Sequence, residues 1–297
     1  MARKLIFFIN PISGTKNKQT LARKIEDKCQ SHQFDFEIMP TNKEGDYNFL
    51  PEKIIREKIT DIIICGGDGT IKQVTSFLLG CEVTVGVIPV GSGNGLALGA
   101  GIGANVGKAL DIIMHNKASY IDGFLVNGQF GCMLAGTGFD AKVAYEFSKQ
   151  KTRGLLPYVK LSLQHFFSSK GYSFVVEWNG HRMETTALFI SVANSNQFGS
   201  RIRIAPGASL SDGLLDIVVV HSKNKLITAL SLLRQISFGK IRSGNEAVKR
   251  NVSYFHTDHI TIQNPQLAPL HIDGEPTPSE AVIDIKIIRN AFRLLLP

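Results

Sequence analysis

The sequence predicts an α/β domain followed by a β-rich domain, with a cleft between them. Three observations support this division of the 297 residues. Strand-like and helix-like segments alternate through about the first 120 residues, which is typical of a doubly wound α/β domain. Three strands in this part run into glycine-bearing turns. From Ser119 onward strand-like segments dominate, so we place the domain boundary near residue 120.

The sequence of the first 120 residues predicts alternating strands and helices. Short apolar runs indicate the strands, and amphipathic or helix-compatible stretches indicate the helices. We expect strands at 5–9, 35–39, 62–65 and 83–90, and helices at 17–30, 51–58, 71–79, 96–103 and 105–116.

Residues 61–70 contain a candidate phosphate-binding turn. The run 62–65 is apolar without alternation, which is typical of a strand buried on both faces of a parallel sheet. The three glycines that follow allow close approach to the backbone, and the next helix presents N–H groups to an anion. Asp68 would repel a phosphate, so the turn predicts a phosphate together with a cation. The alternative is an ordinary strand-to-helix turn with Asp68 as the N-cap.

Three glycine turns of the first half are expected to converge. They lie at 10–14, 66–70 and 91–95, each directly after a predicted strand. In a parallel sheet such turns line one edge, where ligands bind. The convergence favours a phosphate site more strongly than any single turn does.

The second half predicts a largely β structure. We expect strands at 119–126, 130–134, 172–178, 182–193, 213–221, 254–263 and 281–288, and helices at 155–168 and 224–237. The Asn127-Gly128 and Asn179-Gly180 pairs between such runs predict β-hairpin turns.

Composition limits the partners and the compartment. The net charge of +8 favours nucleotides, nucleic acid or an anionic membrane surface. Four widely spaced cysteines without a C-x-x-C pair predict reduced core thiols and a cytoplasmic protein. Pro11 ends the first apolar run too early for a signal peptide, and the glycines of the uncharged stretch 83–107 argue against a membrane span.

Four ordered motifs resemble the diacylglycerol kinase catalytic-domain family, which includes soluble bacterial lipid kinases, sphingosine kinases and ceramide kinases. They are NPISG at 10–14, GGDGT at 66–70, PVGSGN at 89–94 and DGEP at 273–276. GTGFD at 136–140 and DGLLD at 212–216 also resemble family segments. Each motif alone is weak, but their order and spacing along the whole chain are specific.

The resemblance implies a fold and a reaction. The N-terminal domain, 1–120, is expected to be like that of NAD kinases and phosphofructokinases. The C-terminal domain, 121–289, is expected to be a β-sandwich, and the last strand, 290–297, is expected to return to the first domain. The implied reaction transfers the γ-phosphate of ATP to a lipid hydroxyl with Mg²⁺.

The resemblance also implies site residues. It places nucleotide contacts at Asn10, Thr41, Gly66, Gly67, Asp68, Gly69, Thr70, Ile71, Lys72 and Ser92. The backbone of the neighbouring turn, at Gly91 and Asn94, offers the same chemistry for phosphate. Lys16 is a candidate for a positive charge that interacts with phosphate. The equally favoured alternative is a lysine exposed to solvent at the start of a helix.

Three carboxylates are the candidate catalytic groups. Asp68 is expected to hold Mg²⁺ or to act as a base. Asp273 and Glu275 are expected to share one face of an extended segment, because they lie two residues apart. The resemblance implies that a carboxylate of this motif accepts the substrate proton, and we favour Glu275. The alternative is an ordinary surface turn.

A second metal site is implied by the DGLLD segment. It resembles a structural Mg²⁺ loop in bacterial members of the family, with Asp212, the Leu214 carbonyl and Ser209 as ligands. The alternative is an Asp-Gly turn before a strand.

Asn94 is followed by Gly95, where many bacterial diacylglycerol kinases carry Asn-Asp. This departure is closer to sphingosine and ceramide kinases, so the lipid specificity stays open.

Lipid access requires an apolar cleft or a membrane-facing surface. Basic residues at 149–153 precede an apolar, aromatic stretch at 155–167, which suits transient docking on anionic lipid or, as the alternative, a buried core helix. A basic cluster at 240–250 is a further surface feature. We expect a lipid substrate and no nucleic acid, and a homodimer stays open.

Three other functions compete with a lipid kinase. An NAD kinase shares the GGDGT turn, but the DGEP motif and the β-rich half favour the lipid kinase. A Rossmann dehydrogenase is weakly suggested by 99–104, which does not follow a strand directly. A non-catalytic nucleotide- or lipid-binding regulator could share the fold, although all three carboxylates are present.

Overall fold

The computed structural model describes residues 3–14, 17–115, 117–148, 166, 169–197, 204–222 and 251–297. The chain forms two compact units, one from Met1–Asp122 with Arg289–Pro297 and the other from Gly123–Ile288. The expected helices at 155–168 and 224–237, Lys16, and the basic segments at 149–153 and 240–250 lie outside the described residues, apart from Phe166.

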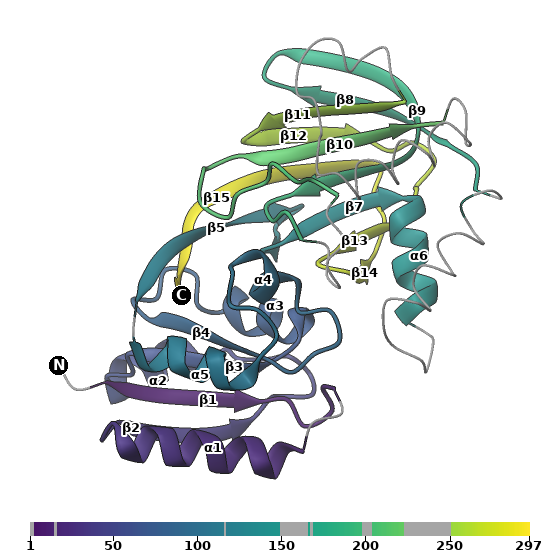
Figure 1. Cartoon of the computed structure of the whole chain (residues 1–297). Coiled ribbons are helices and arrows are strands. Elements are labelled where there is room, and N and C mark those ends of the chain that lie inside the picture. The colour runs from purple at the N-terminus through teal and green to yellow at the C-terminus, as the bar shows by residue number, and fades with distance from the viewer. Residues whose placement is uncertain are drawn as a thin grey trace. The chain divides into compact units, whose positions relative to one another are not determined.

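Strands and helices alternate in the first unit (Figure 1). Its elements are β1 (Lys4–Ile9), α1 (Lys18–Ser31), β2 (Asp35–Pro40), α2 (Leu50–Glu57), β3 (Asp61–Gly66), α3 (Asp68–Ser76), β4 (Thr84–Pro89), α4 (Gly95–Gly99), α5 (Val106–His115), and parts of β5 (Ala118–Val126) and β15 (Val282–Leu295).

The sheet of the first unit is parallel, in the order β2-β1-β3-β4-β15. The chain moves from β1 to β2 in one direction and from β2 through β3 to β4 in the other. Because such crossovers are right-handed, α1 covers one face, and α2 and α3 cover the other. The doubly wound arrangement therefore follows from the strand order.

Burial explains the apolar strands of this unit. All six residues of β3 and of β4 are buried, as the runs without alternation predict. Arg3 forms a two-pronged ion pair with Asp61, which is the first residue of β3 (Nη2–Oδ1 2.7 Å, Nε–Oδ2 3.1 Å). This buried charge pair lies at the amino end of the strand, away from the turns that follow the strands.

Two helices differ from the predicted bounds by more than one residue. Helix α3 begins at Asp68, three residues earlier than expected, with Gly67 as its N-cap. Helix α4 ends at Gly99 because Gly101 and Gly103 take left-handed conformations, with φ of 76° and 80°.

The second unit is mainly antiparallel β structure (Figure 1). Beyond its parts of β5 and β15, its elements are β6 (Gln129–Gly131), β7 (Leu134–Gly138), α6 (Phe139–Ser148), β8 (Tyr172–Trp178), β9 (His181–Ala193), β10 (Leu215–His221), β11 (Val252–Thr257), β12 (His259–Gln263), β13 (Leu270–Ile272) and β14 (Glu275–Thr277).

One apolar core joins the strands of the second unit. Side chains from β5, β7, β8, β9, β10, β12, β13 and β15 pack into a single buried cluster. A second cluster covers the other face of β9 and β10 and includes Phe139 and Val143 of α6. Sheet faces that enclose a shared core are the arrangement of a β-sandwich.

The predicted Asn-Gly hairpins are confirmed. Asn127 and Gly128 join β5 to β6, and Asn179 and Gly180 join β8 to β9, all with positive φ. Paired positive φ values in a two-residue loop are typical of the type I′ turn.

Two predictions for the second unit were wrong, and one helix was missed. The single strand expected at 130–134 is divided between β6 and β7, and the one expected at 254–263 is divided between β11 and β12. In the latter case the halves have different partners, since β11 pairs with β10, whereas β12 pairs with β8 and β15. The helix α6 after the GTGFD motif was not predicted.

In the described residues the cysteines are free thiols, and the helices can be assessed as possible membrane spans. None of the four cysteines forms a disulfide; Cys29, Cys65 and Cys132 are buried, and Cys81 is half-buried. Burial raises the pKa of the Cys65 thiol, so it stays protonated at neutral pH. In the described part of the chain, every helix is too short or too polar to cross a bilayer.

Candidate active site

The turns after β1, β2, β3 and β4 begin at the same level of the sheet. In the strand register Ile9 lies beside Pro40 on one side and Cys65 on the other, and Cys65 lies beside Ile88. The four strands therefore end together, and we call the segments that follow, 10–14, 41–46, 66–70 and 90–95, the loop edge. The order of the strands puts the switch in chain direction between β1 and β3, which is where ligands bind in such sheets.

Hydrogen bonds connect the turns of the loop edge. The Asn10 amide Nδ2 donates to the Thr70 hydroxyl at 2.8 Å, so the turn after β1 is fixed to the turn after β3. The Asn10 Oδ1 accepts from the Ile12 N–H within its own turn. The Thr41 N–H donates to the Ile9 carbonyl at 3.1 Å, which adds the turn after β2. Three predicted nucleotide-binding residues are thus brought together.

Glycines allow close approach at the loop edge. A Cβ on Gly91 would lie 2.5 Å from the Gly67 Cα, so the turns after β3 and β4 touch backbone to backbone. Gly14, with φ of 58°, lies so close to the Val90 carbonyl that a Cβ would overlap it. A side chain at Gly66 would collide with Thr70. Gly91 and Gly14 are therefore required by contacts between turns, and Gly66 by a contact within its own turn.

Asp68 is held by the turn after β4. Its Oδ2 accepts the Gly95 N–H at 2.9 Å and its Oδ1 accepts the Leu96 N–H at 3.2 Å. These two N–H groups open α4, whose own N-cap, Asn94, makes no capping bond. The alternative prediction that Asp68 caps the helix after β3 was wrong, because Gly67 is that N-cap. Asp68 caps α4 instead.

The start of α3 fits an anion. Its N-cap, Gly67, has no side chain to accept the N–H groups of the first turn. Lys72, one turn into the helix, is half-buried. A helix N-terminus with its dipole and N–H groups attracts phosphate.

Thr41 is fixed by a buried tyrosine. The Tyr47 hydroxyl accepts the Asn42 N–H at 3.0 Å and forms a hydrogen bond with the Thr41 side chain. Burial raises the pKa of Tyr47, so the hydroxyl stays neutral and remains a donor as well as an acceptor. Sequence reasoning missed Tyr47, although an aromatic residue beside a polar loop was a usable signal.

Ser92 and Asn94 lie in the turn after β4. Ser92 is exposed, whereas Asn94 is buried with φ of 52°. The Asn94 Nδ2 donates to the Gly91 carbonyl at 2.9 Å, and its Oδ1 has no hydrogen-bond partner among the described residues. A buried acceptor without a donor is costly, so this turn is suited to a ligand that supplies one.

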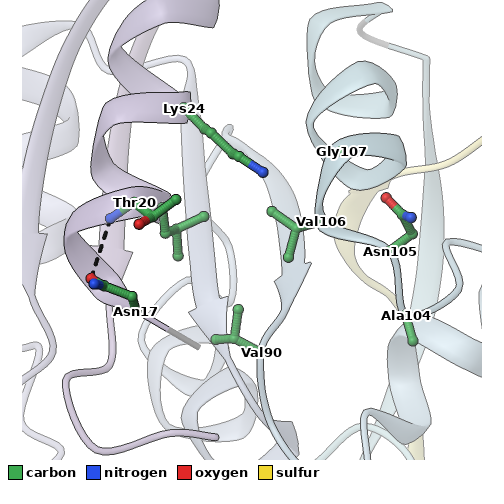
Figure 2. A pocket seen from close by; sticks show the side chains of 9 residues that line it. Asn17, Thr20, Lys24, Val90, Ala104, Asn105, Val106 and Gly107 are labelled. Atoms are coloured by element: carbon green, nitrogen blue, oxygen red, sulfur yellow. Dashed lines mark hydrogen bonds between the residues drawn. The ribbon is translucent and has the colours of Figure 1, made fainter. Parts of the chain in front are cut away.

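A pocket of about 430 Å³ opens beside the loop edge between α1 and α5 (Figure 2). Figure 2 shows the Lys24 side chain extending from α1 toward Val106 at the start of α5. Val90, at the end of β4, contributes to the apolar part of the lining. Val90 lies in the PVGSGN motif, but no motif marks Lys24 or Val106, so the sequence alone did not predict the pocket.

In the second unit, the DGEP motif forms a tight hairpin. Ile272 of β13 pairs with Glu275 of β14, and Asp273 and Gly274 are the two turn residues, with φ of 54° and 81°. The expected extended segment was wrong, because the Asp-Gly pair takes left-handed conformations. Glu275 is half-buried at the first position of β14.

Asp273 is buried and held by backbone N–H groups. Its Oδ2 accepts from Cys132, and its Oδ1 accepts from Met133 and Leu134, all at 2.9 Å. Cys132 and Met133 thus bond the carboxylate and lie outside the strands, whereas Leu134 begins β7 in register with Ala193 of β9. This explains why the strand expected at 130–134 is divided.

The DGLLD segment forms local turns. The exposed Asp212 accepts the Leu214 N–H on Oδ1 at 3.1 Å, and the Ser209 hydroxyl accepts the Ser211 N–H at 3.5 Å. Buried Asp216 accepts a hydrogen bond from the Tyr254 hydroxyl, and burial raises the pKa of its carboxyl. The described residues contain no group of three or more His, Cys, Asp or Glu side chains arranged for a metal. The Mg²⁺ loop stays a prediction.

Two family models match the chain in sequence. The diacylglycerol kinase catalytic domain matches residues 4–126, and the YegS C-terminal NAD kinase beta sandwich-like domain matches residues 134–296. The second match alone spans more than half of the chain.

Relatives match along nearly the full length. A diacylglycerol kinase of Bacillus subtilis (strain 168) is 27% identical over 280 residues, covering 93% of this chain and 90% of that protein. A probable lipid kinase, YegS-like, of Citrobacter koseri is 27% identical over 271 residues, covering 89% and 87%. A crystal structure of a diacylglycerol kinase from Bacillus anthracis str. Sterne has a TM-score of 0.75 at 22% identity, covering 99% and 97%. The predicted fold, a parallel α/β domain and a β-sandwich-like domain, is confirmed.

Proposed function

Because this chain belongs to the family that joins a diacylglycerol kinase catalytic domain to a YegS-type C-terminal domain, it is a lipid kinase, and we propose that it phosphorylates the hydroxyl of a diacylglycerol- or sphingoid-type lipid. The phosphate donor implied by a kinase family is ATP. The observation that carries the proposal beyond the family is the loop edge, where the turns after four strands begin at the same level of the sheet and Asp68 bonds the turn after β4.

The loop edge supplies what phosphoryl transfer needs for the donor. Phosphoryl transfer depends mainly on positioning and on neutralising phosphate charge. The N–H groups at the start of α3 and the Thr70 hydroxyl, which is fixed by Asn10, are suited to phosphate oxygens. Thr41 and the turn at 91–94 are the further proposed nucleotide contacts.

Asp68 is proposed to hold a Mg²⁺ ion, directly or through water. Its two carboxylate oxygens accept the Gly95 and Leu96 N–H groups, and carboxylate oxygens are ligands that a hard cation such as Mg²⁺ prefers. The ion would neutralise phosphate charge that Asp68 alone would repel. The two N–H bonds fix the orientation of the carboxylate before any ligand binds.

Glu275 is proposed to accept the proton of the lipid hydroxyl. It is half-buried and directly follows a rigid turn, whereas the Asp273 carboxylate is engaged with three backbone N–H groups. In this proposal the hydroxyl oxygen attacks the γ-phosphorus, the bond from that phosphorus to the β,γ-bridging oxygen breaks, and ADP leaves, while the hydroxyl proton passes to a Glu275 carboxylate oxygen. Asp273 acts by positioning the turn.

The first test compares two carboxylate variants with matched controls. Asp68→Asn and Glu275→Gln are each expected to lower kcat by about 100-fold or more, because each removes a charge needed for transfer. Asp111→Asn and Glu280→Gln change exposed acids and are expected to leave kcat within about twofold. Melting temperatures of all four proteins show whether the fold survives. Near-normal transfer by both Asp68→Asn and Glu275→Gln would remove the proposed site.

The acceptor lipid and the partners are further proposals. Asn94-Gly95 favours a sphingoid-type acceptor, whereas the full-length match to a diacylglycerol kinase favours diacylglycerol. Transient contact with an anionic membrane rests on residues 149–167, which lie outside the described residues apart from Phe166. Binding to vesicles with and without anionic lipid tests that contact, and sedimentation tests for a homodimer.

A further inference from the structure

A buried histidine and a buried aspartate lie behind the DGEP hairpin. His271 is the middle residue of β13 and is fully buried, and Asp140 is the second residue of α6 and is 5% exposed. The His271 Nε2 lies 3.4 Å from the Asp140 Oδ2. The lipid kinase reaction as proposed gives neither residue a direct part.

The hydrogen bonds fix which imidazole nitrogen carries the proton. The Gly274 N–H donates to the His271 Nδ1 at 3.2 Å, so Nδ1 must be the unprotonated nitrogen. The proton therefore resides on Nε2, which faces Asp140. The other oxygen of Asp140 accepts the Ala141 N–H at 2.8 Å, which fixes the carboxylate at the start of α6. The imidazole thus connects α6 to the hairpin turn.

A glycine makes room for this pair. Gly136 of β7 lies directly opposite His271 in the strand register. A Cβ at this position would overlap the Asp140 carboxylate and would lie 2.6 Å from the His271 Nε2. The first glycine of the GTGFD motif is therefore required by the contact between histidine and aspartate.

The turn is held at both of its central residues. The Asp273 side chain accepts the N–H groups of Cys132, Met133 and of Leu134 at the start of β7, and the Gly274 N–H donates to His271. Glu275 comes next in the chain and pairs with Ile272 across the turn. The direction in which Glu275 leaves the turn is therefore set by contacts on both sides.

We propose that His271, oriented by Asp140, is a positioning residue that fixes the hairpin turn and thereby aims Glu275. This inference rests on the proposed role of Glu275 as proton acceptor. Apolar side chains of similar size would fill the same space without burying two ionisable groups, and a buried polar pair commonly adds no stability of its own. The hydrogen bond to the turn is what the polar pair adds, and a small displacement of a catalytic group can cost about 100-fold in rate.

Two amide variants separate the two imidazole nitrogens. In His271→Asn the amide oxygen can take the place of Nδ1 and accept the Gly274 N–H. In His271→Gln the amide reaches the place of Nε2 and leaves the Gly274 N–H without its acceptor. We expect His271→Gln to lower kcat by about tenfold or more, with the KM for ATP unchanged within about twofold, and His271→Asn to keep most of the activity.

Melting temperatures complete the kinetic test. If the role of His271 is purely structural, kcat falls in proportion to the loss of stability. The variant with the lower melting temperature would then also have the lower kcat. Equal loss of kcat in both variants, or a more active His271→Gln, would overturn the proposal.

The protonation of His271 gives a readout that does not depend on activity. In ¹⁵N-labelled wild-type protein at pH 7 we expect the His271 imidazole to show the neutral form with hydrogen on Nε2. Asp140→Asn removes the charge and leaves one oxygen where two now face the Ala141 N–H and the His271 Nε2, so it is expected to change the imidazole signals and to lower kcat. A neutral form with hydrogen on Nδ1, or a doubly protonated ring, would contradict the assignment even if the protein phosphorylates no lipid. Absence of lipid phosphorylation by wild type would instead refute the proposed function.

Discussion

Two carboxylates of this protein each bond backbone N–H groups from a distant segment. Asp68 caps α4 through Gly95 and Leu96, and Asp273 holds the backbone from Cys132 to Leu134. Charge-assisted bonds of this kind are stronger than neutral ones. A loss of activity in variants of either residue therefore has to be separated from a loss of stability.

Replacement of Asp273 tests its structural contribution. Asp273→Ala is expected to destabilise the second unit by about 3 kcal/mol or more, because three N–H groups lose a shared, charged acceptor. Asp273→Asn keeps one acceptor oxygen and is expected to lose about half as much. Urea unfolding measures both changes. Equal stability of the wild type and Asp273→Ala would show that the buried carboxylate is not a structural element.

At the residue scale the sequence predicted positions but not partners. Asn10, Thr41 and Thr70 were predicted as nucleotide contacts, and the structure brings them to one edge of the sheet. The bonds from Asp273 to residues about 140 positions earlier depend on tertiary folding, so no local pattern could reveal them. The nucleotide-binding and catalytic roles themselves stay predictions.

At the scale of elements, glycines determine how closely the turns approach. The Gly67 and Gly91 turns meet backbone to backbone, and the hairpin turn at Asp273 and Gly274 uses two positive φ values. Hairpins with Asn-Gly were predicted, whereas for the equivalent Asp-Gly pair in DGEP a turn was given only as the alternative to an extended segment. The break between β6 and β7 could not be predicted, because its cause is the distant Asp273 carboxylate.

Gly91→Ala tests the contact between turns. Its Cβ would lie 2.5 Å from the Gly67 Cα, so the turns after β3 and β4 must separate. We expect kcat/KM for ATP to fall by about 100-fold, since a shift of about 1 Å in positioning elements has such an effect. Gly180→Ala is the control, because a side chain there meets no atom within 4 Å and adds backbone strain alone. Equal activity of the two variants in steady-state kinetics would contradict the role of the contact.

At the scale of the whole molecule, the chain leaves the first unit within β5 and returns to it within β15. Arg293 and Leu294 of β15 pair in parallel with Thr84 and Val85 of β4. The resemblance to a known family predicted this return, which a local pattern does not reveal. The first unit is therefore completed by residues from the end of the chain.

Leu294→Ala tests whether the returning strand stabilises the first unit. The side chain is fully buried, so its truncation is expected to cost about 2–5 kcal/mol. Arg293→Ala changes an exposed neighbour in the same strand and is expected to cost about 0.5 kcal/mol or less. Thermal unfolding monitored by circular dichroism compares the two. Equal melting temperatures would show that the end of β15 is dispensable.

The central claim, phosphoryl transfer to a lipid, is tested most directly by following the γ-phosphate of labelled ATP. Wild-type protein and Asp68→Asn are each incubated with labelled ATP, Mg²⁺, a lipid extract and NAD, and the products are separated and identified by mass spectrometry. The account predicts labelled phosphate on a lipid hydroxyl with wild-type protein, at least about 100-fold less with Asp68→Asn, and none in NADP. Label in NADP with none in any lipid would contradict it.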